Sequence, residues 1–436
     1  MNFKKVLLII VVLFLMVNVY AEKPIYVEVY PDHGDIVDSS KVDRIYVKFN
    51  QKMSKKGYSF MYYRYKSIFP ETVGKPKWIS NTECVLEVDL KKGKKYAFAL
   101  NRRTNTGNFK NIKGESAKYY PVLFQTKPEN KKYRSNKNLN KKVYKRLVKF
   151  IKNDYSYYNY NKDINYDKIL LNYKNKIINS KTFYQLAINI GQALSKFKDP
   201  HVWTYYKKLY IPSFRRDIKI DANFNYIKSN VSDLKNYGRT IYAGNINNKI
   251  GYLFIGTWSK NKLDLNKLFN AYNKIKIYDK LIIDVRFNSG GDENKVQKFA
   301  GIFTGKKIKY AKQELINGKT YTRELLPNKN FKKYNGDVVV LTGNRIMSSN
   351  EAFLLMMKQI PNCTLIGKPS YGSSGNPQRY SLLTEVNIYL PGWKAMNMDG
   401  EIIEGKGVKP DIIIKKSEKE YYRSDPTFIN AVEYME

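Results

Sequence analysis

The stretch Lys280-Leu-Ile-Ile-Asp-Val-Arg-Phe-Asn-Ser-Gly-Gly-Asp292 joins a mostly apolar run of strand length to a glycine-rich bend. The apolar run predicts a central strand, because strands buried on both faces lack polar alternation. Gly290 and Gly291 allow the backbone to turn its amides towards an oxyanion, which a side chain would obstruct. Taken alone, the two glycines favour a simple loop.

Strand and helix patterns alternate on both sides of this stretch, from Lys249 onward. Alternation of this kind predicts an α/β core. The predicted strands are Ile250–Ile255, Val338–Thr342 and Thr364–Ile366, and the predicted helices are Leu263–Ile277 and Glu351–Ile360.

A serine-rich turn, Ser348-Ser349-Asn350-Glu351, lies between a predicted buried strand and an apolar helix. Ser348 and Glu351 have the spacing of a capping box, in which each satisfies a free amide of the other. A serine at such a turn is also where a nucleophile gains from backbone amides and the helix dipole. The two interpretations are compatible.

Three helices are predicted ahead of this core, at Val143–Tyr155, Tyr166–Ile178 and Thr182–Phe197. Their apolar residues recur at helical spacing, and they end at Lys198-Asp-Pro-His201, where the proline stops the helix. Residues 129–142 are polar and basic without periodicity, which indicates a linker before a helical segment over 143–201.

The region 22–128 has the pattern of an all-β sandwich, with short strands separated by turn residues. Predicted strands are Ile25–Tyr30, Arg44–Phe49, Cys84–Leu90 and Lys95–Leu100. The segment also resembles bacterial immunoglobulin-like modules, through Pro31-Asp-His-Gly34 and Phe49-Asn-Gln-Lys-Met53. Such modules bind or space, and no catalytic group stands out in this one.

Residues 1–21 are interpreted as a secretory signal peptide, with Lys4 and Lys5 ahead of the apolar run Val6–Val17. The run is short for a membrane span, which needs ~20 residues. We therefore expect export to the periplasm, the cell envelope or the medium, with no integral membrane segment after cleavage. An uncleaved membrane anchor is the alternative.

The chain has 436 residues and a formal net charge of +40, with 78 lysines and arginines against 38 acids. These cations are scattered through every segment, which indicates solvated faces rather than a nucleic-acid groove. Two cysteines and two histidines are too few for a disulfide scaffold or a cysteine- or histidine-rich metal site. No metal or organic cofactor is expected.

The segment 140–415 resembles the tail-specific, or C-terminal processing, serine peptidase family. Four ordered motifs carry the resemblance: Asp284-x-Arg286-x-Asn288-x-Gly290-Gly291, Ser348-x-x-Glu351, Gly367-x-Pro369-x-x-Gly372, and the string from Asp399 to Asp411. The resemblance implies a peptidase core of crotonase/ClpP-like ββα units over 202–436. It also implies Ser348 as nucleophile, with the amides of Gly290 or Gly291 and of Ser349 as the oxyanion hole.

The general base distinguishes two branches of that family. Ser-Lys peptidases carry a lysine where this chain has Ser373, whereas Asp199-Pro-His201 resembles the Asp-x-His of the tricorn-like branch. In that branch histidine is the base and a C-terminal glutamate supports it, which implies His201 and Glu404. Pro200 replaces the branch's serine, which leaves Ser373 as a candidate substitute, and Glu351 is a further candidate supporting residue. The interval between His201 and Lys249 is too short for a PDZ domain.

The sequence therefore predicts an exported serine endopeptidase that acts on unfolded or extended polypeptides by a Ser-His(-Glu) mechanism. A catalytically weak or inactive protein that binds peptides or small lipophilic ligands on the same fold is the alternative. A third interpretation, an envelope adhesin or spacer, would leave the C-terminal motifs unexplained.

Overall fold

The computed structural model describes residues 25, 27–103, 106–128, 134–215 and 218–436, and the chain divides into two compact units, Met1–Arg134 and Ser135–Glu436. The predicted signal peptide lies outside the described residues. Within the described part of the chain, no helix is both long and apolar enough to cross a bilayer.

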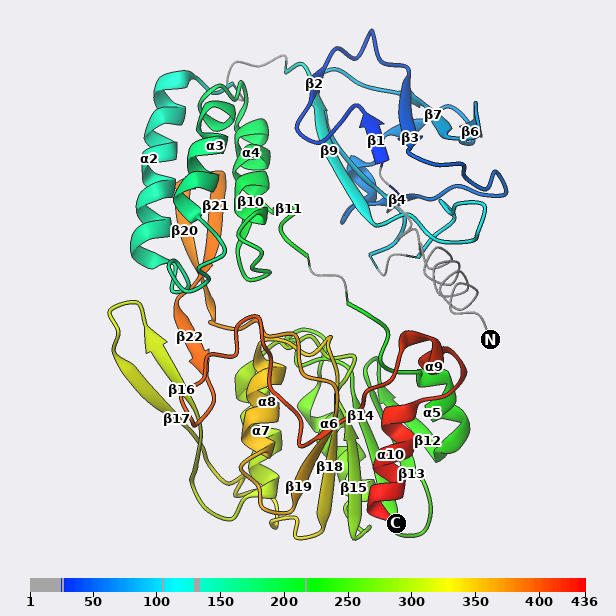
Figure 1. Cartoon of the computed structure of the whole chain (residues 1–436), viewed down its shortest axis with the longest axis vertical. Coiled ribbons are helices and arrows are strands. Elements are labelled where there is room, and N and C mark those ends of the chain that lie inside the picture. Colours follow the sequence, from blue (N-terminus) through cyan, green and yellow to red (C-terminus); the bar gives the residue numbers. More distant parts are fainter. Residues whose placement is uncertain (1–24, 26, 104–105, 129–133, 216–217) are drawn as a thin grey trace, which may run out of the picture. The chain divides into compact units, whose positions relative to one another are not determined.

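The N-terminal unit consists of two antiparallel-rich sheets (Figure 1). One apolar cluster draws on both of them, with Val47 from the first sheet and Phe98 and Phe124 from the second. The predicted strands are confirmed to within three residues at their ends, whereas the immunoglobulin-like topology stays a prediction. The first sheet has the order β1(Val27–Tyr30)-β3(Arg44–Phe49)-β7(Glu83–Asp89)-β5(Glu71–Thr72), with β6(Lys77–Trp78) also on β7, and the second β2(Ile36–Val37)-β9(Tyr120–Thr126)-β8(Lys95–Leu100)-β4(Phe60–Tyr62).

The second unit opens with three helices, α2(Lys137–Asp154), α3(Tyr166–Ile178) and α4(Phe183–Ser195). The predicted linker is wrong over residues 137–142, because they form the first turns of α2. Asn136 caps that helix by accepting from the Leu139 amide at 2.9 Å. Asn140 then donates to the carbonyls of Ile178 and Ser180. Tertiary hydrogen bonds therefore hold a turn whose composition is that of a linker.

The core is a seven-stranded mixed sheet. Its first three strands pair antiparallel, and all the later pairs are parallel. Its central strand β15(Lys280–Asp284) lies between two parallel neighbours, as the apolar run predicts. The order is β12(Ser232–Gly238)-β13(Ile241–Asn245)-β14(Ile250–Ile255)-β15-β18(Asp337–Thr342)-β19(Cys363–Gly367)-β23(Ile412–Ile413).

Helices cover both faces of this sheet (Figure 1). Along β15, Ile283 packs into a cluster with α6, α7 and α8, whereas its neighbour Ile282 packs into a second cluster with α5 and α10. Successive strand residues point to opposite faces, so each face needs its own helical layer. The helices are α5(Phe224–Asn230), α6(Leu265–Ile275), α7(Glu293–Ala300), α8(Ser349–Met357), α9(Glu418–Arg423) and α10(Pro426–Met435).

Two smaller sheets join distant parts of the second unit. The strand that follows His201 pairs with a strand near the C-terminus, with Trp203 opposite Tyr389. Because of this pairing, His201, which follows the helical segment, lies close to the C-terminal motifs. The sheets have the orders β11(Leu209–Ile211)-β10(Trp203–Tyr206)-β21(Val386–Pro391)-β20(Pro377–Leu383) and β17(Thr320–Leu325)-β16(Ile308–Leu315)-β22(Trp393–Met396).

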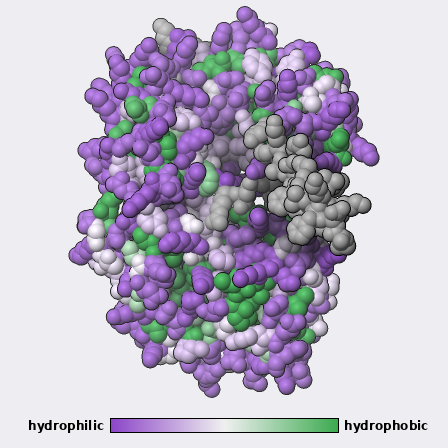
Figure 2. All heavy atoms as spheres, in the orientation of Figure 1, coloured by the Kyte–Doolittle hydropathy of each residue, from purple (hydrophilic) through white to green (hydrophobic). Residues whose placement is uncertain are grey.

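Hydrophilic side chains dominate the face of the molecule that Figure 2 shows, and apolar residues appear between them in small groups. Cys84 and Cys363 are both free thiols and belong to different units.

Candidate active site

Ser348 occupies a strained turn at the start of helix α8. Its backbone has φ 59° and ψ −134°, in a region that residues with a side chain rarely adopt. The side chain is half-buried, whereas the helix behind it is fully buried. Strain of this kind persists where the surroundings fix it, and it is frequent at functional sites.

Glu351 supplies one half of the predicted capping box, since its carboxylate accepts from the Ser348 amide at 3.2 Å. The same carboxylate accepts from the Ser370 hydroxyl at 2.5 Å and from the amides of Gly372 and Ser373 at 2.7 and 3.1 Å. Burial raises the pKa of Glu351 to about 7, although the four donors favour its ionised form. Glu351 therefore ties the Ser348 turn to the loop 370–373.

The glycine-rich loop after β15 is held against helix α8 by two buried asparagines. Asn288 donates to the Ile255 carbonyl at 3.2 Å, and Asn350 donates to the carbonyls of Val285 and Asn288 at 3.1 and 2.9 Å. The Asn350 carbonyl oxygen accepts from the Trp258 indole at 2.7 Å. Buried polar groups that are fully bonded in this way position a loop firmly.

Gly290 lies directly against the serine turn. A methyl group built on it would come within 2.7 Å of the Met347 carbonyl and 2.9 Å of the Ser348 side chain. Its amide donates to the Asn288 side chain at 2.9 Å, so this amide already has an acceptor, and the role of Gly290 as an oxyanion donor stays a prediction. Gly290 also permits the close approach of the loop.

The amides of Gly291 and Ser349 remain as the two candidate oxyanion donors. Gly291 pairs with Trp258 through a bridge that uses the Gly290 carbonyl and the Asp292 amide. That bridge leaves the Gly291 amide without a partner among the described residues. Ser349 is the first residue of α8, where an amide has no acceptor within the helix.

His201 is buried and follows the predicted helix stop. Its amide donates to Asp199 at 2.7 Å, and Asp199 also accepts from the Tyr155 hydroxyl at 2.9 Å. On the ring, Nδ1 is hydrogen-bonded to the Ser373 hydroxyl. Burial lowers the pKa of His201 to about 4, so the imidazole is neutral at pH 7.

Ser373 connects His201 to Ser348. Its hydroxyl contacts the imidazole, and its carbonyl accepts from the Ser348 amide at 2.8 Å. No hydrogen bond joins His201 directly to Ser348 within the part of the chain that the structure describes. Ser373, at the sequence position where the Ser-Lys branch carries a lysine, therefore contacts both His201 and Ser348.

Glu404 lies in the loop beside this group and accepts from the Ser374 amide at 3.2 Å. Burial raises the pKa of Glu404 well above its usual range, and the charges of Asp199 and Glu351 raise it further. Burial also raises the pKa of Asp199, to about 6. The carboxyl groups of Glu351, Asp199 and Glu404 thus lie in one buried region with the neutral imidazole of His201.

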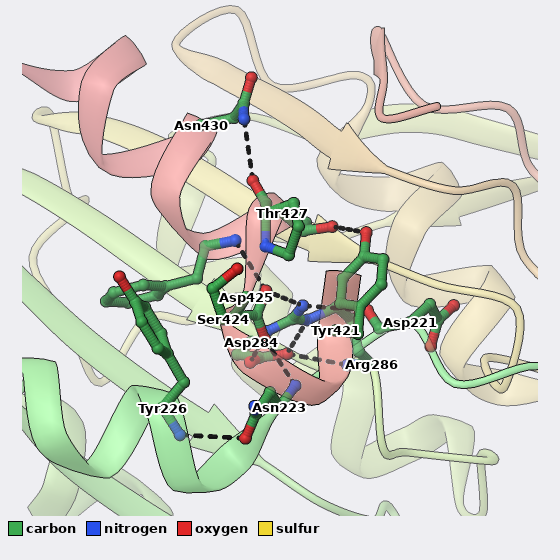
Figure 3. Close-up of polar contacts among 12 residues, drawn as sticks. Asp221, Asn223, Tyr226, Asp284, Arg286, Tyr421, Ser424, Asp425, Thr427 and Asn430 are labelled. Atoms are coloured by element: carbon green, nitrogen blue, oxygen red, sulfur yellow. Dashed lines mark hydrogen bonds and ion pairs between the residues drawn. The ribbon is translucent and has the colours of Figure 1, made fainter. Parts of the chain in front are cut away.

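The Asp284-x-Arg286 part of the loop motif forms a buried ion network (Figure 3). The Arg286 guanidinium pairs with Asp284 and with Asp425, at 2.7 Å in each case. Asp425 caps helix α10, and its second oxygen accepts from the Asn223 amide at 2.7 Å. The network joins the end of β15 to the C-terminal helix, which is a structural role.

The structure thus brings the Ser348, Glu351 and Ser373 of the prediction into one hydrogen-bonded group with His201, and places Glu404 next to it. Sequence reasoning missed several positioning residues: Asn350, Tyr155, Trp258, Ser370 and Asp425. Asp425-Pro426 is a readable helix start. Its pairing with Arg286 depends on the fold and has no signal in the sequence.

Among residues 25, 27–103, 106–128, 134–215 and 218–436, no three His, Cys, Asp or Glu side chains are arranged to hold a metal ion. The donors and acceptors around Ser348 can bind an acyl group and move a proton.

The sequence of this chain is similar to those of known peptidases. The carboxy-terminal processing proteases CtpB and CtpA of Bacillus subtilis are 28% identical over 180 residues and 25% identical over 176 residues. These matches cover 41% and 40% of this chain, and the chain spans only 36% of the length of either relative.

A solved structure from Parabacteroides merdae, described as a candidate peptidase, aligns with a TM-score of 0.57 and 20% identity. The alignment covers 68% of this chain and 96% of the Parabacteroides merdae chain, which shows that the two share a fold. The sequence profile of Peptidase family S41 matches residues 249–414, which hold Ser348, the glycine-rich loop and Glu404. The chain therefore carries a domain of peptidase family S41.

Proposed function

We propose that this chain is an exported serine endopeptidase that hydrolyses peptide bonds in unfolded or extended polypeptides. The observation that carries the proposal is the Ser348 turn, which is strained, half-buried and linked through Ser373 to a neutral histidine. Its activity and substrate class also draw on the likeness to the two processing proteases.

Ser348 is the nucleophile and His201 the general base. The Ser348 oxygen bonds to the substrate carbonyl carbon while its proton passes to His201. Because Nδ1 faces Ser373, Nε2 is the ring nitrogen available to take that proton. The imidazolium then returns it to the leaving amine, and the C–N bond breaks to give an acyl-enzyme that water hydrolyses by the same route.

The negative charge on the carbonyl oxygen is met by the amides of Gly291 and Ser349. Each preorganised donor of this kind is worth ~10²–10³ in kcat. The positive end of the α8 helix dipole, at its N-terminus, adds to this stabilisation. Asp199, which is mostly ionised at pH 7, provides the negative potential that stabilises the transient imidazolium, whereas Glu404, whose pKa is raised well above its usual range, supports the site through its hydrogen bond with the Ser374 amide.

Export rests on the sequence of residues 1–21, and the N-terminal β-rich unit is proposed to contribute to substrate docking. If it does, deleting residues 22–128 slows the cleavage of long substrates while short peptides are cleaved as before. Equal cleavage of the same long substrates after the deletion would contradict the docking role.

The first test is the hydrolysis of casein, an unfolded protein, by residues 22–436, next to Ser348→Ala and His201→Ala. A matched control is Ser229→Ala, since Ser229 is an exposed helix serine away from the site. A fluorophosphonate that labels activated serines, located by mass spectrometry, identifies the nucleophile independently of substrate choice. We expect the adduct on Ser348 and loss of activity by more than ~10³-fold in both site variants.

Activity that survives Ser348→Ala would refute the assignment of the nucleophile. If the wild-type chain neither cleaves casein nor takes the label, the alternative function is favoured, a binding protein for peptides or small lipophilic ligands. Two replacements favour that alternative, Pro200 for the serine of one branch and Ser373 for the lysine of the other.

A further inference from the structure

A groove of about 560 Å³ runs along one side of the N-terminal unit. Its lining includes strand β4 with the residues before it, from Tyr58 to Tyr62, the turn Gly74–Pro76 between β5 and β6, and the segment Thr106–Asn108. Phe69 and Leu86 contribute apolar surface to it. All the lining residues belong to this one unit.

Strand β4 is the end strand of its sheet, so one of its backbone edges has no strand partner among the described residues. The Ser59 carbonyl accepts from the Asn101 amide at 3.0 Å, and the next residues pair as Met61 with Ala99. Hydrogen-bonded pairs alternate along an antiparallel ladder. The amides and carbonyls of Phe60 and Tyr62 are therefore directed away from β8, to the open edge.

An open edge of this kind is a template for another extended chain. Proteins protect such edges or use them to bind peptides by strand addition. Tyr58 and Tyr62 remain 37% and 57% exposed beside the groove, which is typical of aromatic contacts at binding surfaces. The groove thus offers both backbone pairing and apolar contact.

The positive charge of the groove favours an acidic partner. Lys75, Arg102 and Lys110 line it and are exposed, and none of the described residues that line it is acidic. Within the described part of the chain, none of these three cations forms an ion pair. A second cavity of about 170 Å³ shares Tyr62 and Arg102 and adds Arg103.

We propose that this groove binds an extended acidic polypeptide segment as an added strand on β4. Backbone groups of the segment pair with Phe60 and Tyr62. Alternate side chains lie on the apolar floor, and the carboxylates between them meet Lys75, Arg102 and Lys110. The site lies in the N-terminal unit, and binding there does not require peptidase activity.

The experiment measures fluorescence anisotropy of a labelled peptide with four Val-Glu repeats, using residues 22–436 with Ser348→Ala so that no cleavage occurs. Comparison peptides are four Val-Lys repeats and the block sequence of four valines followed by four glutamates. The block peptide has the same charge without the alternation, which separates strand pairing from attraction to a strongly cationic protein.

Two pairs of variants test the groove. Tyr62→Pro removes the outward amide, whereas Tyr62→Ala keeps it, and proline is tolerated where a strand amide faces solvent. Lys75→Glu with Arg102→Glu reverses the groove charge, and Lys41→Glu with Lys94→Glu makes the same change at exposed lysines outside the lining. Thermal unfolding confirms that each variant is folded.

We expect the Val-Glu repeat to bind at least tenfold more tightly than either comparison peptide. Tyr62→Pro and the groove charge reversal each weaken it at least tenfold, and the control pair leaves it within about twofold. Equal binding of the block peptide, or equal effects of the two charge-reversal pairs, would overturn the proposal. A dimer that Tyr62→Pro dissolves would show that a second copy of the chain occupies the edge, and would also overturn it.

Discussion

Ser373 is hydrogen-bonded to both of the proposed reacting residues, His201 and Ser348. Its hydroxyl is hydrogen-bonded to the His201 ring, and its carbonyl holds the Ser348 amide. In the proposed mechanism, the bond of this hydroxyl to Nδ1 leaves Nε2 as the ring nitrogen that takes the Ser348 proton. At this scale, the site depends on a neutral imidazole and on one small side chain that orients it.

Replacing Ser373 by alanine removes the partner of Nδ1 and leaves the backbone contact in place. We expect kcat to fall ~10–100-fold with KM little changed, as for other partners that orient a functional side chain. Ser373→Thr keeps the hydroxyl and is expected to restore most of kcat. A loss of the same size in both variants would indicate a packing role instead.

The activity of the chain should resist mild acid. A general base must be neutral, and burial lowers the pKa of His201 to about 4, so the fraction of neutral imidazole falls only as the pH approaches that value. We expect kcat/KM to change little between pH 7.5 and pH 6, where an ordinary histidine with a pKa of ~6.5 would already lose activity.

The pH profile of kcat/KM also distinguishes the titration of His201 from that of its neighbour Asp199. Burial raises the pKa of Asp199 to about 6. An acid limb near pH 6 that moves in Asp199→Asn would assign the titration to Asp199. Burial also raises the pKa of Glu351 to about 7, so a limb near 6.5 that neither Asp199→Asn nor Glu351→Gln moves would show that the pKa of His201 is not lowered as described.

At the scale of elements, the site is a junction between the loop after β15 and the first turn of α8. Asn288 and Asn350 fasten the loop, and Trp258 pairs with it. Gly290 allows the two backbones to approach. The glycine-rich motif is therefore a packing requirement as much as a source of amides.

Gly290→Ala tests this close approach. The added methyl group would lie 2.7 Å from a backbone carbonyl that cannot move cheaply, so we expect kcat to fall at least ~10²-fold. Gly318→Ala is the matched control, because Gly318 also has a positive φ but nothing lies within 4 Å of its added methyl. Equal activities of the two variants would exclude the loop from the reaction.

The Arg286 network holds helix α10 to the end of β15. Asp425→Ala leaves a buried guanidinium short of one partner, which costs about 3–5 kcal/mol in comparable buried pairs. Glu324→Ala removes a partly exposed ion pair with Lys307 in the same unit and should cost no more than about 1 kcal/mol. Urea unfolding compares the two, and similar unfolding midpoints would contradict the structural role.

At the scale of the whole molecule, the chain contains two units with separate apolar cores. Phe98 belongs to the core of the first unit, and Ile283 belongs to a core of the second. The domain of peptidase family S41 and its candidate site lie in the second unit, and the edge-strand groove lies in the first. The proposed peptide-binding groove and the candidate active site therefore belong to different units of the chain.

Separate cores predict two unfolding transitions in calorimetry. Phe98→Ala should lower one transition and Ile283→Ala the other, since truncating a buried Phe or Ile costs about 2–5 kcal/mol. A single transition that both substitutions shift equally would show that the units unfold as one.

The sequence by itself determined the strand and helix pattern, the α/β core, and the motifs that identify the candidate nucleophile. Apolar periodicity and glycine-rich turns are local properties, so they can be read from neighbouring residues. The start of α2 could not be read, because tertiary hydrogen bonds from Asn140 support a polar turn.

Only the tertiary structure decided which groups meet. The pairing of β10 with β21 carries His201 to the C-terminal motifs, and Ser373 then links it to Ser348. The occupied amide of Gly290 and the pairing of Arg286 with Asp425 were equally unreadable. Contacts between residues far apart in the chain depend on strand order and packing, which no local pattern encodes.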